Sequence, residues 1–97
     1  MDRLIKHLLS IMHYVYIIKS KKNGAIYTGI TKNVVKRIEE HNSGKNLSTK
    51  RYIPWVCIYI EGYFSEDDAV RREMNLKYLG KAYGQLKGRI RNSLRDA

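Results

Sequence analysis

The sequence predicts a single small α+β domain, in which strands and helices share one hydrophobic core. A chain of 97 residues with 43% hydrophobic content can bury one core of ordinary size but has no room for a second domain. Three apolar or aromatic runs have the composition of strands, and the segments after the second and third runs carry apolar residues at helical spacing. The first two runs are joined by Asn-Gly, which favours an antiparallel hairpin.

The hairpin is expected at the N-terminal end of the domain. Residues 13–20 (HYVYIIKS) and 24–30 (GAIYTGI) are rich in aromatic and β-branched side chains, as strands are. Asn23 and Gly24 lie between them, and both tolerate the positive φ that a tight turn demands. Residues 1–12 precede the domain as a leader of uncertain role. Three interpretations of this leader are open: an extra segment, a short docking helix or an upstream start codon.

A first helix is expected after the hairpin. Thr31 or Asn33 can cap its N-terminus, and the helix should run to about His41. Residues 42–44 follow, and Gly44 suits the left-handed conformation that often ends a helix. The buried stripe of this helix is expected to consist of its apolar side chains, Val34, Val35 and Ile38.

A third strand and a second helix complete the domain, which is expected to span residues 13–81. Residues 55–60 (WVCIYI) are almost continuously apolar, which favours a strand in the centre of the sheet. Ser65 begins a helix with acidic residues in its first turn, and Gly80 closes it. Residues 82–97 form a basic C-terminal tail, and one short helix is predicted there from the spacing of Leu86, Ile90 and Leu94.

The charge favours a polyanionic partner. The chain has 19 Lys and Arg residues against 9 Asp and Glu, a formal net charge of +10, so nucleic acid is the expected partner. A membrane surface is a weaker candidate, because the basic residues are spread along the chain instead of lying on one amphipathic helix. The residues expected to contact nucleic acid lie in the segment 45–52, which should be an exposed loop, on the second helix and in the tail: Lys45, Lys50, Arg51, Lys77, Lys87, Arg89 and Arg91. The alternative for these cations is a solvated surface.

Cysteine usage and hydropathy indicate a cytoplasmic protein. Cys57 is the only cysteine, so an internal disulfide and a zinc site built from thiolates are both excluded. No apolar stretch approaches the roughly 20 residues of a membrane-spanning helix. No small-residue cleavage site follows the first apolar segment, which argues against a signal peptide. A membrane partner is therefore not expected.

One acidic side chain is expected to point inward. On a helical wheel Glu73 lies in the middle of the face that contains Ala69 and Leu76. An inward carboxylate must be paired, protonated or bound to a metal, and a buried ion pair with a Lys or Arg is the commoner case. Arg37 and His41 lie one turn apart on the first helix and can address one ligand, although such pairs also occur on solvated flanks.

The residues with chemical potential occur in an order that resembles the GIY-YIG nuclease family. The order is Tyr14-Val15-Tyr16, Tyr27-Thr28-Gly29, Arg37, His41, and Glu73 followed by Lys77. The resemblance extends along residues 31–44 and 61–77 and covers nearly everything from residue 13 to residue 81. It is to the small stand-alone members, which resemble the N-terminal nuclease domain found in the excinuclease ABC complex. The first triplet reads YVY instead of GIY, and the second reads YTG instead of YIG.

This resemblance implies a three-stranded antiparallel sheet flanked by helices, and a metal-dependent endonuclease that hydrolyses phosphodiester bonds in DNA. One divalent ion, Mg²⁺ or Mn²⁺, would be held by Glu73, since a two-metal site needs several clustered carboxylates. Tyr27 is the expected general base, and Tyr16 would orient the water or the phosphate. Arg37 would bind the scissile phosphate, and His41 would contact phosphate or assist proton transfer.

Two other functions stay open. A non-catalytic nucleic-acid-binding module would explain the charge, and a structural or protein-interaction domain would use the hairpin tyrosines as core and pair Glu73 with Lys77. DNA is expected before RNA, and no base-reading helix is evident, so the substrate would be chosen by its shape, such as a branch or a single strand, or by a partner protein. DNA repair, recombination and mobile elements are all compatible with the family, and the sequence sets no oligomeric state.

Overall fold

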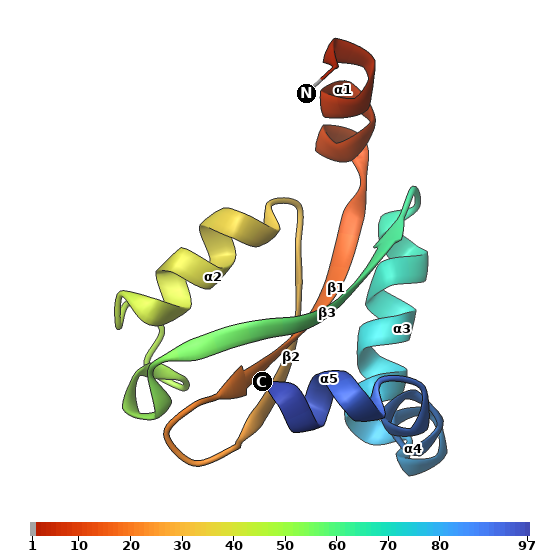
Figure 1. The fold of residues 1–97 in the computed structure, drawn as a ribbon. Coiled ribbons are helices and arrows are strands. Elements are labelled where there is room, and N and C mark those ends of the chain that lie inside the picture. Colours follow the sequence, from red (N-terminus) through yellow and green to blue (C-terminus); the bar gives the residue numbers. More distant parts are fainter. Residues whose placement is uncertain (1) are drawn as a thin grey trace.

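The structure, a computed structural model, describes residues 2–97. Its elements follow in the order α1 (Arg3–Ile11), β1 (His13–Ser20), β2 (Ile26–Thr31), α2 (Val34–Asn42), the 3-10 helix η1 (Lys50–Tyr52), β3 (Trp55–Tyr63), α3 (Glu66–Tyr78), α4 (Gly80–Arg89) and α5 (Arg91–Asp96). Figure 1 shows the sheet in the middle of the molecule, with α2 and α3 on opposite sides of it. The expected α+β fold, a three-stranded antiparallel sheet flanked by helices, is confirmed.

The strand order of the sheet is β2-β1-β3, and both pairings are antiparallel. The prediction that residues 55–60 form the central strand is therefore wrong, because β3 lies at an edge and β1 lies in the centre. Residues 15–18 of β1 are buried on both faces, whereas Ile60 of β3 is 50% exposed. An apolar run predicts burial but does not distinguish an edge strand packed under helices from a central one.

The two faces of the sheet support two separate cores. Val15 and Ile17 of β1 pack on one face against residues of α3 and α4 and against Ile90. Tyr16 and Ile18 point to the other face, because successive strand residues alternate, and they pack there with Trp55 beneath α2. The second face carries most of the polar side chains discussed below.

The hairpin between β1 and β2 is confirmed, but its turn is longer than a two-residue turn. Residues 21–25 connect the strands, and Gly24 has a φ of 77°. Asn23 does not share this conformation, since no non-glycine residue among those described has a positive φ. Its side chain instead accepts a hydrogen bond from the Ala25 amide at 3.0 Å, while Ser20 Oγ accepts from the Lys22 amide at 3.0 Å. Side-chain oxygens thus hold the loop in shape.

The helix α2 begins and ends as expected, but its buried face differs. Asn33 caps it by accepting from the Lys36 amide at 3.1 Å, and Gly44 beyond its end has a φ of 83°. Val35, expected in the buried stripe, is 69% exposed, and the fully buried residue of this helix is His41. The stripe prediction is therefore wrong at Val35. The sheet-facing side includes Ile38 and His41, which turns Val35 toward solvent.

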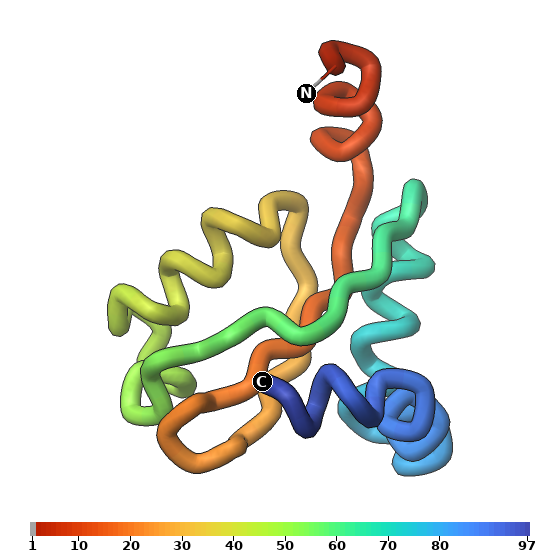
Figure 2. Tube along the Cα trace, viewed as in Figure 1, coloured from red at the N-terminus to blue at the C-terminus, as the bar shows by residue number. Residues whose placement is uncertain are grey.

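The C-terminal segment forms two helices instead of one. The chain leaves α3 at Leu79, starts α4 at Gly80 and breaks again at Ile90 before α5. The expected division at residue 82 coincides with no break, because α4 runs across it and Leu86 is buried in the same core as Val15. Lys19 Nζ of β1 donates to the Leu94 carbonyl oxygen at 2.6 Å. Figure 2 shows the C-terminal end lying beside the strands as a result.

The leader contains one helix that packs little against the domain. Every residue of α1 from Arg3 to Ser10 is exposed, including Leu4 and Leu8. Figure 2 shows α1 projecting from the end of the sheet. Among residues 2–97 no helix combines the length and the hydropathy that crossing a membrane requires.

Candidate active site

Tyr16 stands at the centre of the site, and a glycine makes room for it. The register of β1 and β2 places Tyr16 opposite Gly29, so the two residues share a face of the sheet. A β-carbon at position 29 would lie 2.5 Å from Tyr16 Cζ, far inside van der Waals contact. Only glycine lets the phenol cross β2 here. The last residue of the YTG triplet thus has a steric reason that sequence reasoning did not supply.

The hydroxyl of Tyr16 is enclosed by two side chains of α2. Its oxygen lies 2.8 Å from His41 Nε2 and accepts from Arg37 Nε at 3.3 Å. Burial raises the pKa of Tyr16 to about 12, although the hydrogen bond and charge of Arg37 act to lower it and the Glu73 carboxylate adds to the increase. The phenol therefore keeps its proton at neutral pH in the absence of a ligand.

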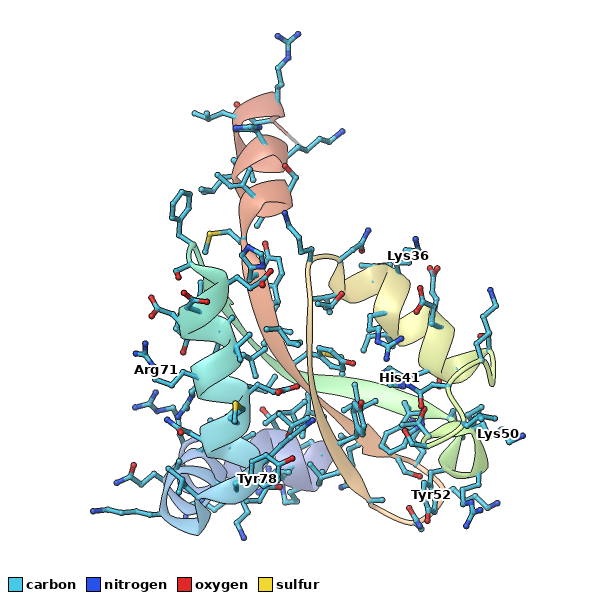
Figure 3. All side chains as sticks on the ribbon, turned by 180° about the vertical axis from the view of Figure 1, so that it is seen from behind. Lys36, His41, Lys50, Tyr52, Arg71 and Tyr78 are labelled. Carbon is cyan, nitrogen blue, oxygen red and sulfur yellow. The ribbon has the colours of Figure 1, made fainter. Side chains whose placement is uncertain are left out.

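Arg37 and His41 lie side by side on α2, as their spacing predicted, and both reach the same oxygen. Arg37 Nη1 also donates to Glu40 Oε2 at 2.9 Å, which holds the guanidinium in place. Burial lowers the pKa of His41, and the positive charge of Arg37 lowers it further while Glu40 opposes this. His41 is accordingly neutral near pH 7. Figure 3 shows its side chain on the side of α2 that faces the sheet.

The second nitrogen of His41 contacts a residue that the sequence did not single out. Thr49 Oγ1 lies 2.8 Å from His41 Nδ1, and Thr49 is only 1% exposed. Trp55 Nε1 donates to the Thr49 carbonyl oxygen at 2.9 Å and anchors it. The expectation of an exposed loop over residues 45–52 is thus wrong at Thr49. A lone threonine in a polar stretch carries no signal of burial, because its contacts are distant in the sequence.

Tyr27 lies beside this cluster and borders a cavity. Its ring centroid is 5.1 Å from that of His41 and 6.4 Å from that of Tyr16. The ammonium of Lys77 lies 5.7 Å from the same ring centroid, which brings α3 to the site. A cavity of about 370 Å³ adjoins the ring and is lined by Ile26, Tyr27, Thr28, Leu76, Lys77 and Tyr83.

Glu73 points inward, as the helical wheel predicted, and it is paired. Its side chain is 16% exposed, and Lys77 Nζ lies 3.3 Å from Glu73 Oε2. Of the three states open to an inward carboxylate, the structure shows the ion pair with a lysine. Because Lys77 also reaches Tyr27, this pair lies against the cavity and connects α3 to the aromatic cluster.

The donor set fits a divalent ion held mainly by water and substrate. Residues 2–97 contain no group of three or more His, Cys, Asp or Glu side chains that could hold a metal. Zinc prefers three or four such ligands, so a zinc centre does not fit. Mg²⁺ commonly keeps several waters and takes one or two carboxylates together with substrate phosphate oxygens. The single carboxylate of Glu73 suits that mode of binding, and Mn²⁺ can replace Mg²⁺ in it.

The altered first triplet is accommodated by the neighbouring edge strand. Tyr14, at the position of the first glycine of GIY, lies opposite Gly62 of β3. A β-carbon at position 62 would lie 3.2 Å from Tyr14 Cε1. The Tyr14 hydroxyl donates to the Leu9 carbonyl oxygen at 2.8 Å. The ring therefore packs without displacing the hydroxyl of Tyr16.

Two of the expected nucleic-acid contacts belong to a basic cluster at the hairpin end. Lys50 and Arg51 form η1, and Lys22 Nζ of the hairpin loop donates to the Arg51 carbonyl oxygen at 3.2 Å. The Lys21 amide donates to the Pro54 carbonyl oxygen at 2.9 Å, which adds a second cation of the same loop. Sequence reasoning missed Lys21 and Lys22, although their adjacency in a turn was a visible charge signal. Figure 3 shows Lys50 beyond the end of α2 that carries His41.

The remaining expected contacts lie in different places. Lys87 Nζ is 5.1 Å from the ring centroid of Tyr83, which lines the cavity beside Tyr27. Arg89 lines a separate cavity of about 260 Å³ with Arg72, and its charge acts on Tyr59 of β3. Lys45 precedes η1, and Arg91 is exposed at the start of α5. The structure therefore brings Lys77 and Lys87 toward the site but not Arg89.

Comparison with known proteins agrees with this geometry. The family model of the GIY-YIG catalytic domain matches residues 12–87. A UPF0213 protein of Staphylococcus haemolyticus is 48% identical over 66 residues, which are 67% of this chain and 79% of that protein. A UPF0213 protein of Halobacterium salinarum is 38% identical over 72 residues, 73% of this chain and 92% of that one.

A solved structure shares the fold. The solution NMR structure of a UPF0213 protein from Bacillus halodurans aligns with a TM-score of 0.51 at 35% identity. The alignment covers 79% of this chain and 83% of that one. These relatives are small proteins, and most of their length is the domain described above.

Proposed function

The chain belongs to the GIY-YIG family, and from that premise we propose that it is a metal-dependent endonuclease that hydrolyses phosphodiester bonds in DNA. The observation that carries the proposal is the convergence of Arg37 and His41 on the hydroxyl of Tyr16. Tyr27 lies against this group, and Glu73 approaches from α3 through Lys77. Phosphodiester hydrolysis needs a water, a group that removes its proton and positive charge near the phosphate, and these side chains offer the last two.

Arg37 is the proposed phosphate ligand. Its Nε is used by Tyr16 and its Nη1 by Glu40, which fixes the plane of the guanidinium. The donors that remain on the fork can reach phosphate oxygens, and a preoriented fork loses little freedom on binding. His41 stays neutral beside it and is the proposed partner for a proton or a phosphate oxygen.

Tyr27 is the proposed general base, and Tyr16 is the proposed orienting group. The ring of Tyr27 lines the open cavity, where an attacking water has access. The hydroxyl of Tyr16 is enclosed, and its pKa is raised to about 12, so it suits a role as a fixed hydrogen-bonding group. Lys77 beside Tyr27 adds positive charge, which stabilises a phenolate at that position.

Glu73 is the proposed ligand of Mg²⁺ or Mn²⁺. When bound, the ion would supply positive charge to the scissile phosphate. Lys77 now occupies the carboxylate at 3.3 Å, and its flexible stem allows the ammonium to move to a phosphate instead. The same lysine can therefore neutralise Glu73 before the substrate binds and contact nucleic acid afterwards.

Two basic surfaces support nucleic acid as the substrate. The hairpin cluster, made of Lys21, Lys22, Lys50 and Arg51, extends beyond one end of α2. No acidic residue occurs between positions 3 and 38 or between 41 and 60, so the charge of this cluster is poorly opposed locally. Lys77 and Lys87 flank the cavity on the side of α3 and α4. Contacts of this kind bind the backbone without reading bases, so we infer selection by substrate shape or by a partner protein.

The test is a cleavage panel with matched variants. Linear, flapped, forked and single-stranded DNA, and the corresponding RNA, are incubated with Mg²⁺, Mn²⁺ or a chelator. We expect the chelator to abolish cutting and Glu73→Gln to abolish it while binding persists. Asp68→Asn removes an exposed carboxylate from the same helix and serves as the control. Chelator-resistant cutting, or full activity of Glu73→Gln, would refute the proposal.

The second candidate is a nucleic-acid-binding module without catalysis. The ion pair between Glu73 and Lys77 favours it, because a carboxylate held by a lysine needs no metal. This function predicts salt-dependent binding by the wild-type protein and no cleavage of any substrate in the panel.

A further inference from the structure

We propose that Thr49 is a positioning residue of the proposed active site, which holds His41 in one tautomer and thereby sets the hydrogen-bond direction at Tyr16. The inference rests on the proposed function for its catalytic consequence, but the tautomer itself is a property of the folded protein. Thr49 touches no substrate in this scheme. It acts through His41, and His41 acts on Tyr16.

Thr49 is held rigidly, although it lies in a segment without regular structure. Its carbonyl oxygen accepts from the indole of Trp55 at 2.9 Å. Trp55 is in turn clamped by Asn42 of α2, whose Oδ1 accepts from the Trp55 amide at 2.6 Å and whose Nδ2 donates to the Trp55 carbonyl oxygen at 3.0 Å. This clamp fixes Thr49 relative to the helix that carries His41. The distance of 2.8 Å between Thr49 Oγ1 and His41 Nδ1 is therefore a built contact.

The direction of the hydrogen bonds follows from counting donors and acceptors. Arg37 can only donate, so the Tyr16 oxygen accepts from Arg37 Nε. The phenol has one hydrogen of its own, and among residues 2–97 the acceptor within reach is His41 Nε2 at 2.8 Å. If Nε2 accepts, the proton of the neutral ring must sit on Nδ1. Nδ1 then donates to Thr49 Oγ1.

The series of hydrogen bonds ends on a backbone carbonyl. Thr49 Oγ1 also approaches the Asn46 carbonyl oxygen at 3.5 Å, which can take the hydroxyl hydrogen. Every donor from Arg37 to Thr49 thus has an acceptor. In the opposite direction, Thr49 would donate to Nδ1 and Nε2 to Tyr16, and the buried phenol hydrogen would lose its acceptor among the described residues. A buried donor without a partner is disfavoured, so the first direction is the stable one.

This direction has a functional consequence. Nε2 remains unprotonated and can take the phenol hydrogen, and Thr49 continues to accept from Nδ1 when the ring becomes charged. The orientation of the Tyr16 oxygen, and with it that of Arg37 toward a phosphate, depends on a threonine that contacts neither Tyr16 nor Arg37 in the hydrogen-bond network. Loss of the Thr49 hydroxyl should therefore affect turnover more than substrate binding.

The direct test is the tautomer of His41 by ¹⁵N NMR of the imidazole in the full chain at neutral pH, without substrate. We expect Nδ1 protonated and Nε2 unprotonated in the wild type and in Thr49→Ser, which keeps the hydroxyl. Thr49→Val keeps the shape but removes the acceptor, and we expect it to increase the Nε2-protonated form. A wild-type ring protonated on Nε2 overturns the inference, and so does an unchanged spectrum in Thr49→Val.

The second arm measures cleavage of a substrate that the wild type cuts. Thr49→Val should lower kcat on the order of tenfold with KM nearly unchanged, as for other residues that orient a catalytic group, and Thr49→Ser should restore it. An unchanged kcat in folded Thr49→Val overturns the positioning role. If the wild type cuts nothing in the panel, the proposed function fails, while the wild-type NMR spectrum still decides the tautomer. Should Thr49→Val not fold, that spectrum and the kcat of Thr49→Ser decide the inference.

Discussion

The hydroxyl of Tyr16 occupies the space where a β-carbon of residue 29 would lie, so Gly29 is what allows β2 to pass beneath the phenol. The two residues face each other across the pairing of β1 and β2. The position of the phenol relative to Arg37 and His41 therefore depends on a residue with no side chain.

Replacing Gly29 with alanine should damage both stability and the site. The added methyl group would overlap the phenol ring, and the enclosed ring has little room to move. We expect Gly29→Ala to lower the free energy of unfolding by about 2 kcal/mol, a typical penalty for overpacking, and to abolish cleavage. Urea unfolding measures the first effect. Gly84→Ala is the control, because a β-carbon at position 84 of α4 meets nothing within 4 Å and should stabilise the helix.

The carboxylate of Glu61 should make stability depend on acid pH. Arg72 donates two hydrogen bonds to it, each at 2.9 Å, and the hydroxyls of Tyr59 and Tyr63 donate at 2.5 and 2.6 Å. Burial alone would raise the pKa of Glu61, but these bonds outweigh burial and lower it from 4.5 to about 2. A lowered pKa stabilises the fold above pH 4.5, and this contribution is lost as the pH falls toward 2.

Glu61→Gln should therefore cost about 3 kcal/mol of unfolding free energy at pH 7, because it leaves Arg72 without its counter-charge. The cost should shrink progressively between pH 4.5 and pH 2 as the wild-type carboxylate becomes protonated. Denaturant unfolding of both proteins across this range gives the difference. An equal cost at pH 7 and pH 2 would contradict the proposed ion-pair origin of the effect.

Removing Lys77 should expose the carboxylate of Glu73 to cations. The ammonium lies 3.3 Å from Glu73 Oε2 and competes with a metal for it. We expect Lys77→Met to bind Mn²⁺ roughly tenfold more tightly than the wild type, since a nearby positive charge is lost, while Lys77→Met/Glu73→Gln should bind it weakly. Calorimetric titration with Mn²⁺ measures both. Arg71→Met, which frees the exposed Asp68 on the same helix, should leave the affinity unchanged.

The hairpin cluster and Arg89 should differ in their effect on DNA binding. Lys50→Ala and Arg51→Ala should each reduce the dependence of log K on log salt concentration by about 1, the effect of one lost phosphate contact. Arg89 lies near Tyr59 and the β3 edge, away from Tyr27, so Arg89→Ala should leave this dependence unchanged. Fluorescence anisotropy over a series of salt concentrations distinguishes the two. A larger effect of Arg89→Ala would place the nucleic acid on the other edge of the sheet.

Features that depend on neighbours in the sequence were predictable. The hairpin, the Asn33 cap and the inward orientation of Glu73 each follow from a local pattern, and the structure has all three. Arg37 and His41 were predicted side by side because helical spacing is fixed. The GIY-YIG resemblance added the fold, since it carries information about how distant segments pack.

Features that depend on distant contacts were not predictable in the same way. Val35 and Ile38 look alike in the sequence, and only the angle at which α2 meets the sheet decides which one is buried. The central position of β1 instead of β3 depends on pairing order, which apolar composition does not encode. Thr49 joins the site through contacts with His41 and Trp55 that no pattern in the 45–52 segment announces.

The central claim is that Glu73, Tyr27, Arg37 and His41 form one metal-dependent phosphodiesterase site. The most direct measurement is the single-turnover cleavage rate of a flapped or single-stranded DNA at saturating protein, with Mg²⁺, for the wild type and Glu73→Gln. The account predicts a loss of at least about 100-fold for Glu73→Gln, with an unchanged dissociation constant for the same DNA measured in the presence of chelator. Equal rates for the two proteins would contradict it.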